Sequence, residues 1–136
     1  MRKNTIFVIA VLSLAGCSLT ADKVDSYEPS GNPNFQMADN LSCRIEASSH
    51  KADIGQTISL LALTSEKPKV LFSGSGGTSP MQKLFESDDT LVVQLVASIS
   101  GSTDTVVLNM KNGTFARSTA GNFAGVSASA GIGSCK

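Results

Sequence analysis

After residue 40, apolar and polar residues alternate along most of the chain with a period of two. This period is typical of β-strands with one buried face. In the run LSCRIEA, four positions share such a face: Leu41, Cys43, Ile45 and Ala47. Further runs rich in strand-forming residues are QTISLLALT (56–64), PKVLFSG (68–74), LVVQLVASI (91–99), TVVLNM (105–110) and FARS (115–118).

Turn signals separate these runs at intervals of about eight to twelve residues. The pair Asn112-Gly113 predicts a hairpin with a type I′ turn, and turns are also expected within ISGSTD (99–104) and ESDD (86–89). We therefore expect an all-β fold, a small antiparallel barrel or sandwich of about seven or eight strands.

Two segments leave alternatives open. SPMQKLFES (79–87) fits a helix start, with a capping box from Ser79 to Gln82, but it also fits a strand that leads into the following turn. Continuity of the hairpin slightly favours the strand. The small residues of FAGVSASAGIGSC (123–135) fit a close approach of backbones at a barrel bend, or a weak, bent edge strand.

The N-terminus has a different pattern. Arg2 and Lys3 precede the uncharged run TIFVIAVLSL (5–14), which is too short to cross a bilayer core of about 30 Å. A basic start, a short apolar core and small residues are typical of a secretory signal. Here the small pair Ala15 and Gly16 leads directly into Cys17.

The stretch Leu14-Ala15-Gly16-Cys17 resembles the lipobox of bacterial lipoproteins. This resemblance implies a signal helix at 1–16, cleavage before Cys17, and acyl chains on Cys17 that hold the chain on a membrane. In Gram-negative members of that family, Asp directly after the cysteine favours retention in the inner membrane. This chain has Ser18 at that position, which favours the outer membrane.

Residues 17–40 then predict a lipidated, flexible tether, because 18–40 is polar, lacks an apolar period and contains Pro29 and Pro33. Within it, NFQM around Phe35 is the piece most suited to docking as an edge strand. The β domain is expected over 41–136.

Composition excludes one class of function and suggests a covalent link. Without residues 1–16, nine Lys and Arg stand against eleven Asp and Glu, a net charge of −2, with no basic cluster and no Trp. Nucleic-acid binding is therefore not expected.

Export favours a disulfide between Cys43 and Cys135 over a metal pair or free thiols. Neither cysteine has a neighbouring Cys or His, which a zinc site would need.

No pattern predicts catalysis, a cofactor or a metal. The only histidine, His50, lies in SSHKAD with Ser48, Ser49 and Asp53, a polar turn without the rigid burial of a catalytic triad. The adjacent acids Asp88 and Asp89 would point to opposite faces of a strand.

The glycine-rich stretch Ser73, Gly74, Ser75, Gly76 and Gly77 lacks the Gly-Lys-Ser/Thr of a phosphate-binding loop. It is instead a candidate loop for binding a protein partner.

These features predict an envelope lipoprotein whose small β domain binds a protein partner or supports an envelope assembly, without catalysis. A surface or exclusion factor of a mobile element is a further possibility. A lipoprotein with a small barrel and an early-to-late disulfide also resembles the membrane-bound inhibitors of c-type lysozyme. In that family, a Ser-Gly-x-x-Tyr loop enters the lysozyme cleft, and Ser73 and Gly74 match its start. This resemblance implies an alternative function, inhibition of a lysozyme-like host enzyme.

Overall fold

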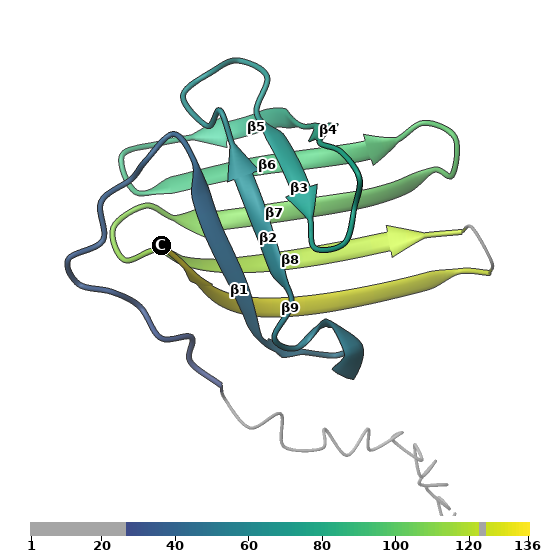
Figure 1. Cartoon of the computed structure of the whole chain (residues 1–136), viewed down its shortest axis with the longest axis horizontal. Coiled ribbons are helices and arrows are strands. Elements are labelled where there is room, and N and C mark those ends of the chain that lie inside the picture. The colour runs from purple at the N-terminus through teal and green to yellow at the C-terminus, as the bar shows by residue number, and fades with distance from the viewer. Residues whose placement is uncertain (1–26, 123–124) are drawn as a thin grey trace, which may run out of the picture.

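The computed structural model describes residues 27–122 and 125–136 and confirms an all-β fold (Figure 1). Among these residues, no helix is long and apolar enough to cross a membrane. The described residues form nine strands and one 3₁₀ turn, η1 (Lys51–Asp53), which lies between the first and second strands. The strands are β1 (Leu41–Ser48), β2 (Thr57–Leu61), β3 (Lys69–Phe72), β4 (Ser79–Pro80), β5 (Gln82–Glu86), β6 (Thr90–Ala97), β7 (Ser102–Asn109), β8 (Thr114–Gly121) and β9 (Ser127–Cys135).

All nine strands belong to one antiparallel sheet, in the order β4-β3-β2-β1-β9-β8-β7-β6-β5. Its two outermost strands, β4 and β5, are separated in the sequence only by Met81, so the sheet curls into a nearly closed barrel. The segment 79–87 is thus strand rather than helix. It is split at Pro80, which has no N–H for a ladder, and at Met81, whose N–H donates to the carbonyl of Pro68 (2.8 Å) while its side chain is buried. This break raises the strand count to nine.

The first and last long strands, β1 and β9, lie side by side and carry the predicted disulfide. Cys43 and Cys135 are directly opposite each other in the ladder and are bonded. Two places further along β1, Ile45 lies opposite Gly133, where a Cβ would stand 1.9 Å from the carbonyl oxygen of Arg44. The small residues of the last stretch therefore allow close backbone approach in an interior strand, and the edge-strand alternative is wrong.

The barrel interior holds the apolar face that alternation predicted, with two corrections. Leu41, Cys43 and Ile45 are buried, but a β-bulge between Ile45 and Ala47 reverses the pattern and places Ala47 among the residues of an outer groove. Likewise, the alternation of β6 ends before Ile99, which lies in the following turn and is fully exposed.

The hairpin between β7 and β8 is confirmed, but its turn is not type I′. Residues 110–113 form a four-residue connection in which Gly113 has φ of 72° and donates to the carbonyl of Asn109 (2.9 Å). Asn112 has no positive φ, and its side chain instead accepts hydrogen bonds from the N–H and hydroxyl of Thr114.

Residues 27–40 lie along the barrel without forming a strand, and we call this segment the strap. The N–H of Asn32 donates to the carbonyl of Asn112 (2.8 Å), Phe35 and Met37 pack against the core, and Asp39 accepts from Thr64. The predicted tether therefore ends earlier than residue 40 within the described part of the chain, and NFQM docks through Phe35 as irregular backbone rather than as an edge strand.

The antiparallel connections place four loops at one end of the barrel, which we call the mouth. They follow β1, β3, β6 and β8, and Figure 1 shows the β6–β7 and β8–β9 hairpins projecting furthest in this direction. The connections after β2, β5 and β7 lie at the opposite end with Lys136. Buried apolar side chains occupy the middle of the barrel, and the candidate site lies toward the mouth.

Candidate functional site

An ion pair between Asp104 of β7 and Arg117 of β8 lies inside the barrel near the mouth. The Nε of Arg117 donates to both carboxylate oxygens (3.0 and 3.1 Å), and its Nη2 donates to Oδ2 (2.6 Å). The two side chains are 9% and 15% exposed, respectively. Such a bidentate, largely buried contact fixes the guanidinium plane.

The guanidinium also stacks on an aromatic ring. The Cζ of Arg117 lies 5.1 Å from the centroid of Phe72, at the end of β3. This distance is within the range of cation–π attraction. The guanidinium of Arg117 is thus held from two sides, by the carboxylate of Asp104 and by the ring of Phe72 on the facing wall of the barrel.

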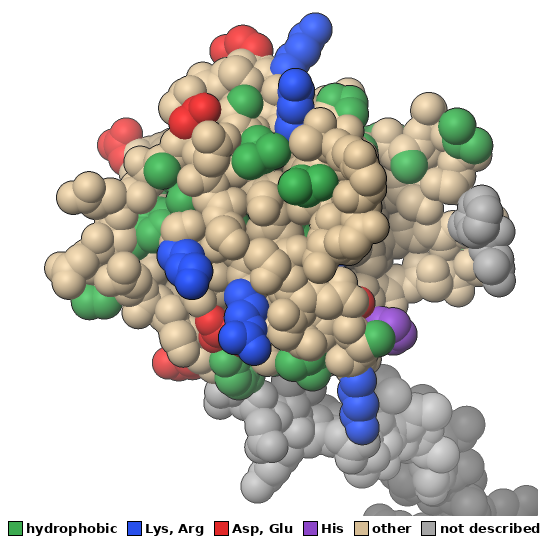
Figure 2. All heavy atoms as spheres, viewed as in Figure 1, with side chains coloured by type: hydrophobic (Ala, Val, Ile, Leu, Met, Phe, Trp, Pro, Cys, Tyr) green, Lys and Arg blue, Asp and Glu red, His purple; other side chains and the backbone are tan. Residues whose placement is uncertain are grey.

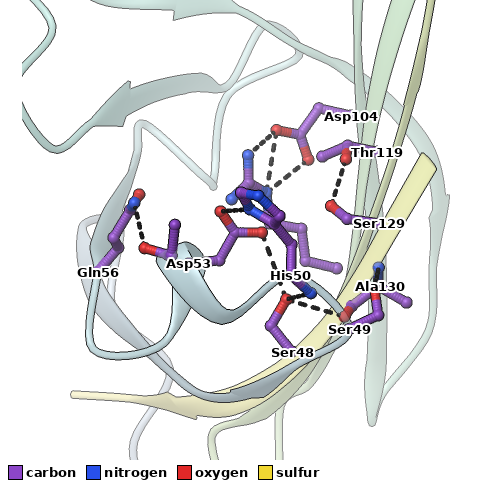
Figure 3. Close-up of polar contacts among 11 residues, drawn as sticks. Ser48, Ser49, His50, Asp53, Gln56, Asp104, Thr119, Ser129 and Ala130 are labelled. Carbon is purple, nitrogen blue, oxygen red and sulfur yellow. Dashed lines mark hydrogen bonds and ion pairs between the residues drawn. The ribbon is translucent and has the colours of Figure 1, made fainter. Parts of the chain in front are cut away.

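Hydroxyl groups and the histidine extend this polar cluster (Figure 3). The side-chain oxygens of Thr119 and Ser129 are 2.7 Å apart, across the β8–β9 ladder. On the β1–β2 connection, Nδ1 of His50 lies 3.2 Å from Oδ1 of Asp53. Oδ2 of Asp53 accepts from the hydroxyl of Ser48 (3.3 Å).

The contacts of this connection do not form the hydrogen-bond chain of a triad. The hydroxyl of Ser48 contacts Asp53 and the carbonyl of Ala130 rather than the imidazole, and Ser49 accepts from the N–H of Ala130. The side chain of His50 is 66% exposed. Among the described residues, no group of three His, Cys, Asp or Glu side chains has the geometry to hold a metal ion.

Two adjoining hollows open at the mouth. One of about 280 Å³ contacts Asp104, Thr119 and Ser127, with Phe72 and Leu95 on its apolar side. The other, of about 320 Å³, contacts His50, Asp53, Arg117, Thr119, Ser127 and Ser129. Because Thr119 and Ser127 line both, we treat the two hollows as one site, the polar recess.

The predicted partner-binding loop, Ser73 to Gly77, lies at the same end of the barrel, directly after Phe72. All five residues are exposed. The hydroxyl of Ser75 lies within hydrogen-bond distance of two carbonyl oxygens, those of Phe72 (2.9 Å) and Gly77 (3.0 Å), and so links the two ends of the loop. The loop therefore begins next to the recess, whose wall includes Phe72.

A second hollow, the outer groove, lies on the outside of the barrel over β8, β9 and β1. It measures about 660 Å³ and is lined mainly by small and apolar side chains. The lining residues are Tyr27, Ala47, Thr105, Val107, Ala116, Ala130, Gly131 and Ile132, together with Ser48, Ser49, Arg117 and Ser118. A largely apolar hollow of this size is the usual starting hypothesis for a binding site.

The groove continues into a row of apolar residues that runs around the barrel. Directly opposite partners in successive ladders are Ala47, Ile132, Ala116, Val107, Val92 and Phe85, which we call the outer row. Phe85 is 54% exposed and Val107 is 40% exposed. A contiguous exposed apolar band of this kind commonly marks an interaction surface.

Tyr27 forms one wall of the groove and is fixed by Glu46. Its hydroxyl donates to Oε2 (2.7 Å), which also accepts from the N–H of Ser30, while Oε1 accepts from Ser134. Burial raises the pKa of Glu46, but these hydrogen bonds and the nearby Arg44 outweigh it and leave that pKa below its ordinary value. The hydrogen bond to Glu46 raises the pKa of Tyr27.

The remaining predicted residues lie elsewhere. Cys17 and the rest of the signal and tether up to residue 26 are outside the described residues. Asp88 and Asp89 occupy the turn after β5, where Asp89 pairs with Lys111 (3.1 Å). Neither the outer row nor the Asp104–Arg117 pair was predicted from the sequence. The sequence does contain a signal for the pair. Asp104 lies two residues from the apolar Val106, and Arg117 lies two residues from Phe115, so each alternating run carries one charged residue on its inward face.

Comparison with known protein families, curated proteins and solved structures finds no match to this chain.

Proposed function

We propose that this chain is a lipoprotein of the bacterial outer membrane, held by acyl chains on Cys17, whose barrel binds a membrane-attached protein through the outer groove. No catalysis is part of the proposal. The observation that carries it is the outer row, which continues the apolar groove along β5 to β9 and leaves Phe85 and Val107 exposed. Covering such a surface with a protein removes apolar area from water.

The length of chain before the groove supports a partner in the same membrane. Ten peptide steps separate Cys17 from Tyr27, which lines the groove. Even fully extended they span at most about 36 Å, at about 3.6 Å per residue. If Cys17 is acylated, the groove therefore stays near the membrane surface, within reach of proteins embedded there.

The groove can be tested by site-specific crosslinking in cells. A photoreactive phenylalanine analogue at Ala116 is expected to give one dominant adduct with an envelope protein, identified by mass spectrometry. The same analogue at Lys69, exposed on β3, serves as the control and should give no such adduct. Adding Val107→Asp should abolish the Ala116 adduct. Equal adducts from both positions, or none from Ala116, would overturn groove binding.

The anchor has its own test. Radiolabelled palmitate should be incorporated into the wild-type chain and not into Cys17→Ser, and only the wild type should fractionate with outer membranes. Label on the Cys17→Ser variant would contradict acylation at this residue while leaving the groove experiment interpretable.

Inhibition of a lysozyme-like host enzyme is the second candidate. It is supported by the nearly closed barrel, the Cys43–Cys135 disulfide between its first and last strands, and the exposure of Ser73 to Gly77 at the mouth. A saturating concentration of the purified protein should then abolish c-type lysozyme activity. Full residual activity would remove this candidate.

A further inference from the structure

The polar recess at the mouth is a second site, distinct from the outer groove, although Arg117 lines both. Its polar groups are held before any ligand arrives. Arg117 is fixed by three contacts to Asp104 and by the ring of Phe72, and the hydroxyls of Thr119 and Ser129 are fixed by each other. Groups pre-ordered in this way lose little conformational entropy on binding.

The recess offers donors and acceptors together. Of the five N–H groups of Arg117, those on Nη1 have no hydrogen-bond acceptor among the described residues. One hydroxyl hydrogen of the Thr119–Ser129 pair remains for a ligand, because the pair uses only one of its two. Ser127 and His50 border the same hollow.

The positive charge of Arg117 is already compensated. Asp104 neutralises Arg117, and the oxygens of Asp53 are engaged by His50 and Ser48. The other residues of β6 and of the β8–β9 hairpin that line the recess are uncharged. In Figure 2 the side chains on the described part of the projecting hairpins are green and tan. An anion would have to compete with Asp104 for the guanidinium and would face Asp53, so an anionic ligand is disfavoured.

The apolar side of the recess completes the pattern. Phe72, Leu95 and Ala97 line the smaller hollow beside Asp104 and Thr119. A sugar ring presents hydroxyls that both donate and accept and, on its other side, C–H groups that pack against such a wall. Hollows of about 280 and 320 Å³ lie just below and just above the lower limit for small-molecule sites, whose volumes run from roughly 300 to 1,000 Å³.

We propose that the polar recess binds one ring of a neutral saccharide. The hydroxyl groups of the ring would contact Nη1 of Arg117 and the hydroxyls of Thr119 and Ser129, with its C–H face toward Phe72 and Leu95. This assigns the mouth to a glycan and leaves the outer groove for the protein partner.

The test is a titration of the ¹⁵N-labelled lipoprotein in detergent, followed by amide NMR spectra. The neutral probes are glucose, galactose, N-acetylglucosamine and its β1,4-linked disaccharide, and the charged comparators are glucuronate and glucose 6-phosphate. At least one neutral probe should give saturable shifts centred on Asp104, Thr119 and Ser129. The charged comparators should bind at least tenfold more weakly.

Two variants check that the shifts report the recess. Thr119→Val keeps the shape of the side chain but removes a hydroxyl, so binding should weaken about two- to tenfold. Thr57→Val makes the same change on β2, outside the recess, and should bind as the wild type does; the spectra also show that both variants are folded. Three outcomes would overturn the proposal: no saturable shift with any neutral probe, shifts located away from the recess, or tighter binding of the charged comparators.

Discussion

The hydroxyl of Tyr27 donates a 2.7 Å hydrogen bond to the carboxylate of Glu46, and this contact holds the start of the strap against the barrel. Glu46 occupies the bulge of β1, where the extra residue leaves the ladder and can reach the strap. One carboxylate therefore joins three segments, since it also accepts from Ser30 and Ser134.

This arrangement predicts that acid loosens the strap. The pKa of Glu46 is lower in the folded chain than its ordinary value of 4.5, so its stabilisation is present above that value and is lost as the pH falls through the folded pKa. Tyr27 is the only tyrosine and there is no tryptophan, so tyrosine fluorescence reports the contact directly. We expect a transition with a midpoint below 4.5 in the wild type.

The variant Glu46→Gln provides the matched comparison. It should show no such transition and should lower the free energy of unfolding at pH 7 by about 1.5–3 kcal/mol, the range for hydrogen bonds to charged groups. An unchanged fluorescence titration in this variant would mean that another group fixes Tyr27.

A second prediction concerns Gly113, where the strap crosses the end of the barrel. A Cβ there would lie 2.5 Å from Cδ2 of Phe35 and 3.0 Å from the carbonyl of Cys135, and φ is 72°. Gly113→Ala should therefore reduce the free energy of unfolding in urea by about 2–4 kcal/mol, combining backbone strain with displacement of Phe35. Gly76→Ala, with an ordinary φ and no atom within 4 Å, should change it by less than about 0.5 kcal/mol. Equal effects of the two substitutions would contradict the packing of Phe35.

The disulfide gives a third prediction. It links residues 92 apart in sequence across the β1–β9 ladder, which joins the two halves of the sheet. On the chain-entropy model, the double variant Cys43→Ala/Cys135→Ala should lose about 4–5 kcal/mol of unfolding free energy. Urea unfolding of the oxidised and double-variant proteins measures this directly. A loss below 1 kcal/mol would contradict the chain-entropy model for this disulfide.

Sequence alternation predicted the fold well because the barrel has one apolar interior, and an inward position must be apolar wherever the strand is regular. It therefore located Leu41 and Leu91 correctly. It failed at Ala47, because nothing in LSCRIEA signals a bulge at Glu46. The bulge depends on partners far away in the chain, Ser134 and the strap.

The candidate sites were harder to predict for a similar reason. The outer row exists only through the register of five ladders, which brings together residues as distant as Ala47 and Ile132. The polar recess needs β7 paired with β8 so that Asp104 lies diagonally from Arg117. Neither register can be read from local propensity, although the lone inward charges of β7 and β8 are visible in the sequence.

The last prediction concerns the interior pair itself. Asp104→Leu alone leaves the guanidinium of Arg117, 15% exposed, without its carboxylate, and should cost about 3–5 kcal/mol of unfolding free energy. The double variant Asp104→Leu/Arg117→Met removes both charges and replaces them with apolar side chains, so it should be more stable than Asp104→Leu. A double-mutant cycle by urea unfolding, with Arg117→Met as the second single variant, measures the coupling. Strictly additive losses would mean that the pair does not stabilise the fold. Strong coupling would mean that Asp104 and Arg117 hold each other in the positions from which they line the recess.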